Sequence, residues 1–190
     1  MKTNFGSVTE AVRMLENGGV VLVPTETVVG LVSTEAGLQK IYNLKGRDAD
    51  KPVALLCRST EEAFSLSDEA PNIARSLASR FWPGSLTMIL KARHGNVNVG
   101  LRVPLGTVRG LLEAYGAPLY ATSANVSGEE APRALGGVAR SIIEGADVVL
   151  TGEPGSGEAS AVVDLTGDEP RILRASERLD RERLRQMLAE

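Results

Sequence analysis

The sequence predicts an α/β fold in which helices pack over a twisted sheet with both parallel and antiparallel strands. Two observations lead to this prediction. Apolar, β-branched runs of strand length alternate along the chain with segments whose apolar residues recur at helical spacing. Two pairs of neighbouring strands, 85–92 with 97–104 and 161–165 with 171–174, are separated by short polar stretches, which is typical of hairpins.

The first elements alternate between helix and buried strand. Ser7 and Glu10 have the spacing of a capping box, and Gly18 stops the helix that begins there. The continuous apolar run 19–24 predicts a strand that is covered on both faces. A helix at 34–44 and a strand at 52–57 are predicted next.

Ser59 and Glu62 repeat the capping-box spacing ahead of a short helix. A longer helix is stopped by the sequence WPG that begins at Trp82. The predicted elements, in order, are helices 60–65 and 70–80, strands 85–92 and 97–104 around a turn at 93–96, helix 107–115, strand 118–123, helix 132–144, strand 147–150, a Gly-rich loop at 151–160, strands 161–165 and 171–174, and a charged helix at 176–189.

Length and composition favour an ordinary globular chain. Its 190 residues suit one domain over 1–190, because domains commonly span about 100–200 residues. Hydrophobic residues make up 43% of the chain, yet no stretch approaches the ~20 apolar residues of a membrane span. The N-terminal segment also lacks the apolar core of a secretion signal. We therefore expect a cytoplasmic protein with no membrane contact.

Several function classes are disfavoured. A net charge of −3 and an aromatic content of 4% argue against a general nucleic-acid binder. Cys57 is the single cysteine and lies in the apolar stretch VALLC, which predicts a buried, inert thiol. His94 is the single histidine and lies in a polar turn, so neither a histidine triad nor a zinc site is expected. The P-loop signature is absent as well.

One charge run stands out. The stretch LKGRDADKPV at 44–53 gathers five charged side chains just before an apolar run; they are Lys45, Arg47, Asp48, Asp50 and Lys51. Such a run is most often a solvated turn. The alternative is a cationic cradle for an anion.

Short polar segments lie at the ends of predicted strands, where ligands bind in open α/β sheets. PTET at 24–27 follows the first strand, and TSANVSG at 122–128 follows another. Arg102 interrupts an apolar strand, Ser160 closes the Gly-rich loop, and Arg174 ends a late strand. Turn formation by the hydroxyls and solvent exposure of Arg102 are the alternatives. Converging hydroxyl, amide and guanidinium groups would instead suit phosphate and carboxylate oxygens.

Together these segments resemble the YrdC family, the L-threonylcarbamoyladenylate synthases. The matching pieces run in family order from about residue 18 to 175 and are PTETVVGL, KGRDADKPV, FWPGSLTMIL, LRVP, TSANVSG, SAVVDLTG and PRILR. The resemblance implies a YrdC-like domain with a concave basic cavity. It implies a nucleotidyltransferase that converts L-threonine, bicarbonate and ATP, with Mg²⁺, into threonylcarbamoyl-AMP and pyrophosphate. The product would pass to a separate tRNA threonylcarbamoyl-transferase complex for tRNA modification.

The resemblance also implies a role for each matching residue. Lys45 and Arg47 would act in catalysis. The implied ATP contacts are Lys45, Arg47, Lys51, Asn98, Ser123, Asn125 and Arg174. The implied threonine contacts are Thr27, Arg102, Ala121 and Ser160. No residue is implied as a metal ligand.

The chemistry agrees with these roles. The threonine carbamate and ATP are both anions, so cations must lie between them before the carbamate oxygen can attack the α-phosphate. Phosphoryl chemistry of this kind is catalysed mostly by positioning and electrostatics, so it needs no histidine or cysteine. The charge run is therefore interpreted as a phosphate cradle. We expect Lys45→Ala and Arg47→Ala to weaken ATP use with little loss of folding.

Three alternatives stay open. VALLCRS at 53–59 is also similar to the YciO-like paralogues, so the same cavity could belong to a non-catalytic or divergent module that binds nucleotide or RNA. A related carbamoyl-adenylate enzyme could act on another amine. A weak RNA contact is a further expectation, to which the charge and aromatic content give little support.

Overall fold

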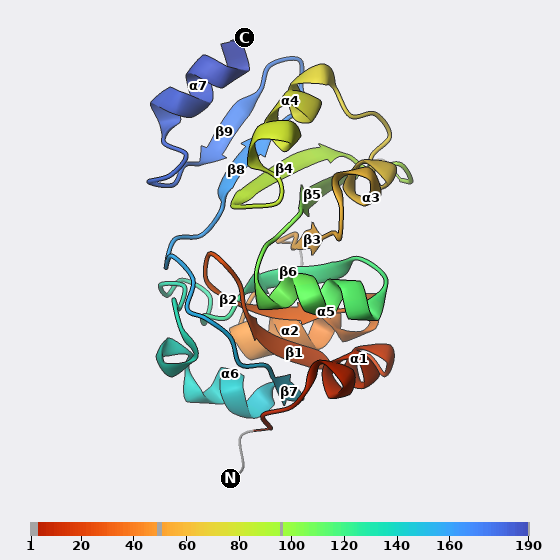
Figure 1. Cartoon of the computed structure of the whole chain (residues 1–190), viewed down its shortest axis with the longest axis vertical. Coiled ribbons are helices and arrows are strands. Elements are labelled where there is room, and N and C mark those ends of the chain that lie inside the picture. Colours follow the sequence, from red (N-terminus) through yellow and green to blue (C-terminus); the bar gives the residue numbers. More distant parts are fainter. Residues whose placement is uncertain (1–3, 49–50, 96, 190) are drawn as a thin grey trace.

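A computed structural model describes residues 4–48, 51–95 and 97–189 of the chain. In these residues the strands form one nine-stranded sheet in the order β7-β1-β2-β6-β3-β5-β4-β8-β9 (Figure 1). The strands are β1 (Val20–Pro24), β2 (Val29–Ser33), β3 (Ala54–Leu56), β4 (Leu86–Lys91), β5 (Asn98–Arg102), β6 (Leu119–Ser123), β7 (Val148–Val149), β8 (Ala161–Asp164) and β9 (Arg171–Arg174). Strand pairs β1–β7, β3–β5 and β4–β8 are parallel and the others antiparallel, which confirms the mixed sheet.

Helices cover this sheet, as predicted. They are α1 (Val8–Glu16), α2 (Leu38–Lys45), α3 (Thr60–Ser65), α4 (Asn72–Phe81), α5 (Thr107–Tyr115), α6 (Arg140–Gly145) and α7 (Arg181–Ala189), with short 3₁₀ turns η1 (Glu35–Gly37) and η2 (Leu135–Gly137). The first capping box is confirmed, because Ser7 Oγ accepts from the Glu10 amide at 3.3 Å and Glu10 Oε2 accepts from the Ser7 amide at 2.7 Å. No helix in the described ranges is long and apolar enough to cross a membrane.

The second capping box is only half formed. Ser59 Oγ accepts from the Glu62 amide at 3.2 Å, as the spacing predicts. The Glu62 carboxylate does not return to the Ser59 amide; its Oε2 accepts from the Arg58 amide at 2.6 Å, and its Oε1 pairs with the Arg58 guanidinium. The Glu62 carboxylate therefore binds Arg58 instead of closing the capping box.

Two predictions of local structure were wrong. The strand β2 was missed, and PTET is the turn of a hairpin in which Thr25 Oγ1 accepts from the amides of Thr27 and Val28 at 3.2 Å each. The helix predicted at 132–144 is replaced by η2 and α6, since Pro132 and the paired glycines at 136–137 break helical continuity.

The ends of other elements shift for local reasons. The C-terminal helix begins at Arg181 rather than near 176. Asp180, directly before it, caps the helix, because its Oδ1 accepts from the Arg183 amide at 2.8 Å. The β4–β5 hairpin is confirmed by the pairing of Lys91 with Asn98, although the predicted turn includes Asn96, which lies outside the described residues.

Three apolar clusters support the sheet. At one end, strand β1 is buried along its whole length: Val21 and Val23 pack toward α1 and α5, whereas Val20 and Leu22 pack toward α2 and α6. This confirms the prediction of a strand covered on both faces.

At the other end of the sheet, the two faces of each strand differ. On β4, Leu86, Met88 and Leu90 pack into the cluster under α4, and the residues between them, Thr87 and Ile89, line a cavity on the opposite face. Side chains alternate along a strand, so one strand supplies both the core and the site.

Candidate functional site

A cavity of about 410 Å³ collects most of the residues that the sequence singled out. Those that line it are Thr27, Arg47, Asn98, Arg102, Ala121, Ser123, Ser160 and Arg174. They come from the PTET turn, the segment after α2, strands β5, β6 and β9, and the end of the Gly-rich loop. Segments far apart in the sequence therefore share one hollow.

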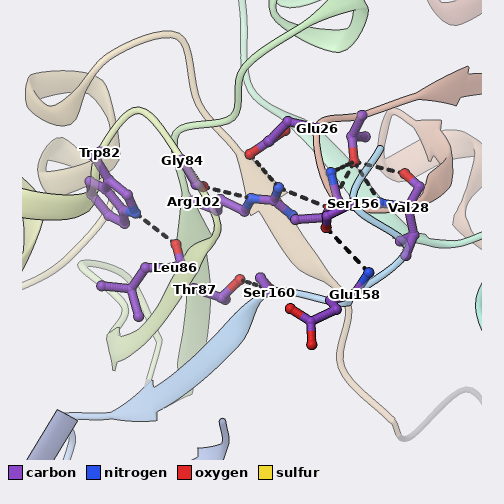
Figure 2. Close-up of polar contacts among 12 residues, drawn as sticks. Glu26, Val28, Trp82, Gly84, Leu86, Thr87, Arg102, Ser156, Glu158 and Ser160 are labelled. Carbon is purple, nitrogen blue, oxygen red and sulfur yellow. Dashed lines mark hydrogen bonds and ion pairs between the residues drawn. The ribbon is translucent and has the colours of Figure 1, made fainter. Parts of the chain in front are cut away.

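Arg102 is 7% exposed and points into a set of acceptors, so the alternative of a solvent-facing arginine is wrong. Its Nε donates to the backbone oxygen of Gly84 at 3.0 Å. Its Nη2 donates to Glu26 Oε1 at 2.5 Å (Figure 2). The same Nη2 donates to Thr27 Oγ1 at 3.0 Å. Sequence reasoning missed Glu26; the one available signal was a carboxylate between two threonines of PTET.

The Gly-rich loop lies against the PTET turn. The amide of Ser156 donates to the backbone oxygen of Glu26 at 3.0 Å, and the amide of Gly157 donates to that of Thr27 at 2.8 Å. A Cβ at Gly155 would lie 2.3 Å from the Thr27 backbone oxygen, closer than real Cβ contacts come. Glycine at 155 is therefore what allows this close approach.

Ser160 joins two parts of the cavity wall. Its hydroxyl lies 2.8 Å from Thr87 Oγ1 (Figure 2), and its backbone oxygen accepts from Arg174 Nε at 2.7 Å. Burial lowers the pKa of Arg174, and the positive charge of Arg102 lowers it further. Thr87 is a second site residue that sequence reasoning missed, because it looks like one alternating position of an ordinary strand.

Lys45 is only 1% exposed and does not line the cavity. Its Nζ donates to the backbone oxygen of Asn125 at 2.6 Å and also to the backbone oxygen of Ser123. Burial, and secondarily the charge of Arg47, lowers the pKa of Lys45 to about 8. Because the side chain is so buried, we now expect Lys45→Ala to lower stability, rather than to leave folding nearly unchanged. Its role toward ATP stays a prediction.

The rest of the charge run divides between the cavity and solvent. Arg47 lines the cavity, and its Nη2 donates to the backbone oxygen of Pro52 at 3.0 Å. Lys51 lies outside the lining and pairs with Asp48 at 3.0 Å, with 55% and 72% of the two side chains exposed. Asp50 lies outside the described residues. A direct phosphate contact by Lys51 stays a prediction.

The loop after β6 is held by its own polar side chains. Ser123 Oγ donates to Asn125 Oδ1 at 2.5 Å, and Asn125 Nδ2 donates to the backbone oxygens of Val126 and Glu129 at 2.8 Å each. Ser123 lines the cavity, whereas Asn125 is not among the lining residues. The nucleotide role of both residues stays a prediction.

The charges of the lining are mixed. Arg47, Arg102 and Arg174 bring positive charge, and Asp164 brings a carboxylate. Burial alone would raise the pKa of Asp164, but hydrogen bonds from Thr166 and the ion pair with Arg171 at 2.5 Å lower it. The basic character expected of the cavity stays a prediction.

Within the described part of the chain, no group of three or more His, Cys, Asp or Glu side chains is placed to hold a metal ion. Cys57 is buried, and burial raises the pKa of its thiol to about 12, with Glu62 adding to the shift. This fits the predicted inert thiol.

Comparison with known proteins agrees with the family resemblance seen in the sequence. The family model for Sua5, YciO and YrdC, described as "Telomere recombination", matches residues 13–176. The threonylcarbamoyl-AMP synthase of Bacillus subtilis (strain 168) is 34% identical over 190 residues, which covers 92% of this chain. This chain spans only 54% of that relative, about half its length.

Solved structures are similar too. P. abyssi Sua5 complexed with L-threonine superposes with a TM-score of 0.87 at 31% identity, over 96% of this chain and 57% of that one. E. coli YciO superposes with a TM-score of 0.74 over 90% of this chain and 91% of that one. At 24% identity, the second likeness supports the α/β fold alone.

Proposed function

Because this chain belongs to the Sua5/YciO/YrdC family, we propose that it synthesises threonylcarbamoyl-AMP from L-threonine, bicarbonate and ATP, with release of pyrophosphate. The observation that carries the proposal is one shared cavity. It joins Arg102 and Ser160, which the family resemblance assigns to threonine, with Arg47 and Arg174, which it assigns to ATP. Two anionic reactants would therefore meet arginine side chains that line one cavity.

The proposed roles follow from charge and reach. The guanidinium of Arg102 suits the substrate carboxylate, and the nearby Thr27 hydroxyl suits the hydroxyl of threonine. Arg47 and Arg174 suit the phosphates and the charge that grows on pyrophosphate as it leaves. The cavity then brings the carbamate oxygen and the α-phosphate together, which removes most of the entropic barrier to their reaction.

Mg²⁺ enters the proposal with the nucleotide. Mg²⁺ is commonly held by substrate phosphates with one or two carboxylates and keeps several waters. Asp164 is the carboxylate found among the described lining residues, and its two oxygens already accept from Thr166 and Arg171, so phosphate oxygens and water would be the main ligands of the ion. When bound, the ion would neutralise phosphate charge.

Incubation with ATP, Mg²⁺, bicarbonate and labelled threonine tests the proposal. Pyrophosphate release that needs both threonine and bicarbonate, together with a labelled adenylate product, is the expected result. Binding of ATP without turnover would identify a non-catalytic module instead. Turnover with another amine in preference to threonine would identify a related carbamoyl-adenylate enzyme.

The wider role is part of the same proposal. The adenylate would pass to a separate tRNA threonylcarbamoyl-transferase in the cytoplasm, so the partnership is through the product rather than through tight tRNA binding. The net charge of −3 fits weak RNA contact at most.

A further inference from the structure

Glu26 has an unusual position for a carboxylate. Only 16% of its side chain is exposed, and its Oε1 accepts from Arg102 Nη2 at 2.5 Å. Its other oxygen, Oε2, is buried and has no hydrogen-bond partner among the described residues. A buried carboxylate oxygen without a donor is costly, so a native structure that keeps one calls for an explanation.

Three of the five N–H donors of Arg102 are used within the described residues. Nε donates to Gly84 and Nη2 to Glu26 (Figure 2). Nη2 also donates to Thr27. No acceptor among the described residues bonds Nη1. Among the residues that the structure describes, the ion pair thus leaves Arg102 Nη1 and Glu26 Oε2 without hydrogen-bond partners.

We infer that Glu26 binds the α-amino group of the substrate, so that the Glu26–Arg102 pair selects zwitterionic α-amino acids. This inference rests on the proposed function and deepens it. In an α-amino acid, the nitrogen and the carboxylate are attached to the same carbon, so a carboxylate and a guanidinium in contact match the two groups. The N–H of the substrate would supply the donor that Oε2 lacks.

Glu26 lies next to the cavity but is not one of its lining residues, so its carboxylate must turn to reach a ligand. Thr25 and Thr27, on either side of it, line the cavity, as does Arg102. The terminal torsion of a glutamate is broad, so its carboxylate can turn toward a ligand while it keeps Arg102. Charge-assisted hydrogen bonds are stronger than neutral ones, which makes the pair a strong filter for a charged amine.

Two other roles for Glu26 predict different behaviour. If it only holds Arg102 in place, its loss would weaken every carboxylate ligand alike. If it only occupies Arg102 until a substrate carboxylate displaces it, its loss would tighten every carboxylate ligand alike. If Glu26 binds the amine, its loss should weaken only those ligands that carry an amino group.

Calorimetric titration without ATP separates these roles. The two ligands are L-threonine and (R)-3-hydroxybutyrate, which keeps the carboxylate and hydroxyl but has no amine. The proteins are the wild type, Glu26→Gln and the control Glu153→Gln, whose side chain is exposed in the Gly-rich loop. The wild type and the control should prefer threonine by roughly 10- to 100-fold, the range of a hydrogen bond to a charged group. Glu26→Gln should lose about tenfold of this preference and keep its affinity for hydroxybutyrate.

Other outcomes overturn the inference. If the wild type binds the two ligands with equal affinity, the inference is wrong, even if Glu26→Gln fails to fold. If Glu26→Gln folds and changes both affinities by the same factor, the inference is also wrong. If the wild type binds no threonine at all, the proposed function falls and this inference falls with it. Threonine binding without any preference for the amine overturns this inference alone.

Discussion

The ammonium of Lys45 lies 2.6 Å from the backbone oxygen of Asn125, although the two residues are 80 positions apart. The contact is returned, because the backbone oxygen of Lys45 accepts from the Ser127 amide at 2.8 Å. The end of α2 is thereby tied to the loop after β6. Arg47 and Ser123, which lie near this contact in the sequence, both line the cavity.

Lys45→Met should destabilise the fold. Methionine keeps much of the length of the side chain but removes the donor, so the carbonyl oxygens of Ser123 and Asn125 lose a buried partner. The expected loss is about 1–3 kcal/mol in the free energy of unfolding by urea. Lys91→Met, on an exposed position of β4, is the control. Wild-type stability in Lys45→Met would contradict a structural role for this ammonium.

The same lysine should make stability depend on pH. Its pKa is about 8 in the folded chain, below the ordinary 10.5, so the unfolded chain binds more protons between these values. The contribution of Lys45 to the free energy of unfolding must therefore rise with pH across this window, by at most about 1.4 kcal/mol per unit. Denaturation of the wild type and Lys45→Met at pH 7.5 and about 9.5 checks it. A difference between the two proteins that does not change with pH would argue against a lowered pKa.

Arg47 and Lys51 should differ in their effect on ATP. Arg47 lines the cavity, whereas Lys51 pairs with Asp48 in solvent. We expect Arg47→Ala to raise the KM for ATP at least about tenfold, as for loss of a charge-assisted hydrogen bond. Lys51→Ala should change it much less. The rate of pyrophosphate release as a function of ATP concentration gives both KM values. Equal increases in KM would indicate that Lys51 contacts the phosphates as Arg47 does.

Gly155→Ala should disturb the threonine side of the cavity. The new Cβ would lie 2.3 Å from the Thr27 backbone oxygen and 2.6 Å from that of Thr25, so the loop must move away from the turn. We expect a lower thermal midpoint and weaker threonine binding, while ATP binding changes less. At Gly136 a Cβ meets no atom within 4 Å, which makes Gly136→Ala the matched control. Equal behaviour of the two variants would show that the loop adapts freely.

Thr87→Val should act on threonine rather than on folding. Valine keeps the shape of threonine but leaves the Ser160 hydroxyl without its partner at 2.8 Å. A neutral hydrogen bond contributes about 1 kcal/mol, so the KM for threonine should rise roughly fivefold. Ser79→Ala, on the exposed face of α4, is the control for loss of a hydroxyl. An unchanged KM would place the hydroxyl pair outside substrate binding.

Much of the fold could be predicted because its signals are local. Apolar spacing identified every strand except β2, and Ser7 marked the start of α1. β2 escaped because its turn at 25–28 has no glycine or asparagine and is closed by the hydroxyl of Thr25 instead. The helix predicted at 132–144 failed where glycine and proline outweighed apolar spacing.

The sequence by itself determined the family, most of the order of elements and the polar segments that reach the cavity, because motifs and periodicity act over a few neighbouring residues. Tertiary structure alone decided which charges face that cavity. Strand order brings Glu26 to Arg102, 76 positions away, and encloses Lys45 while Lys51 stays in solvent. Burial and partner choice depend on contacts between distant segments, and these exist only once the sheet has formed.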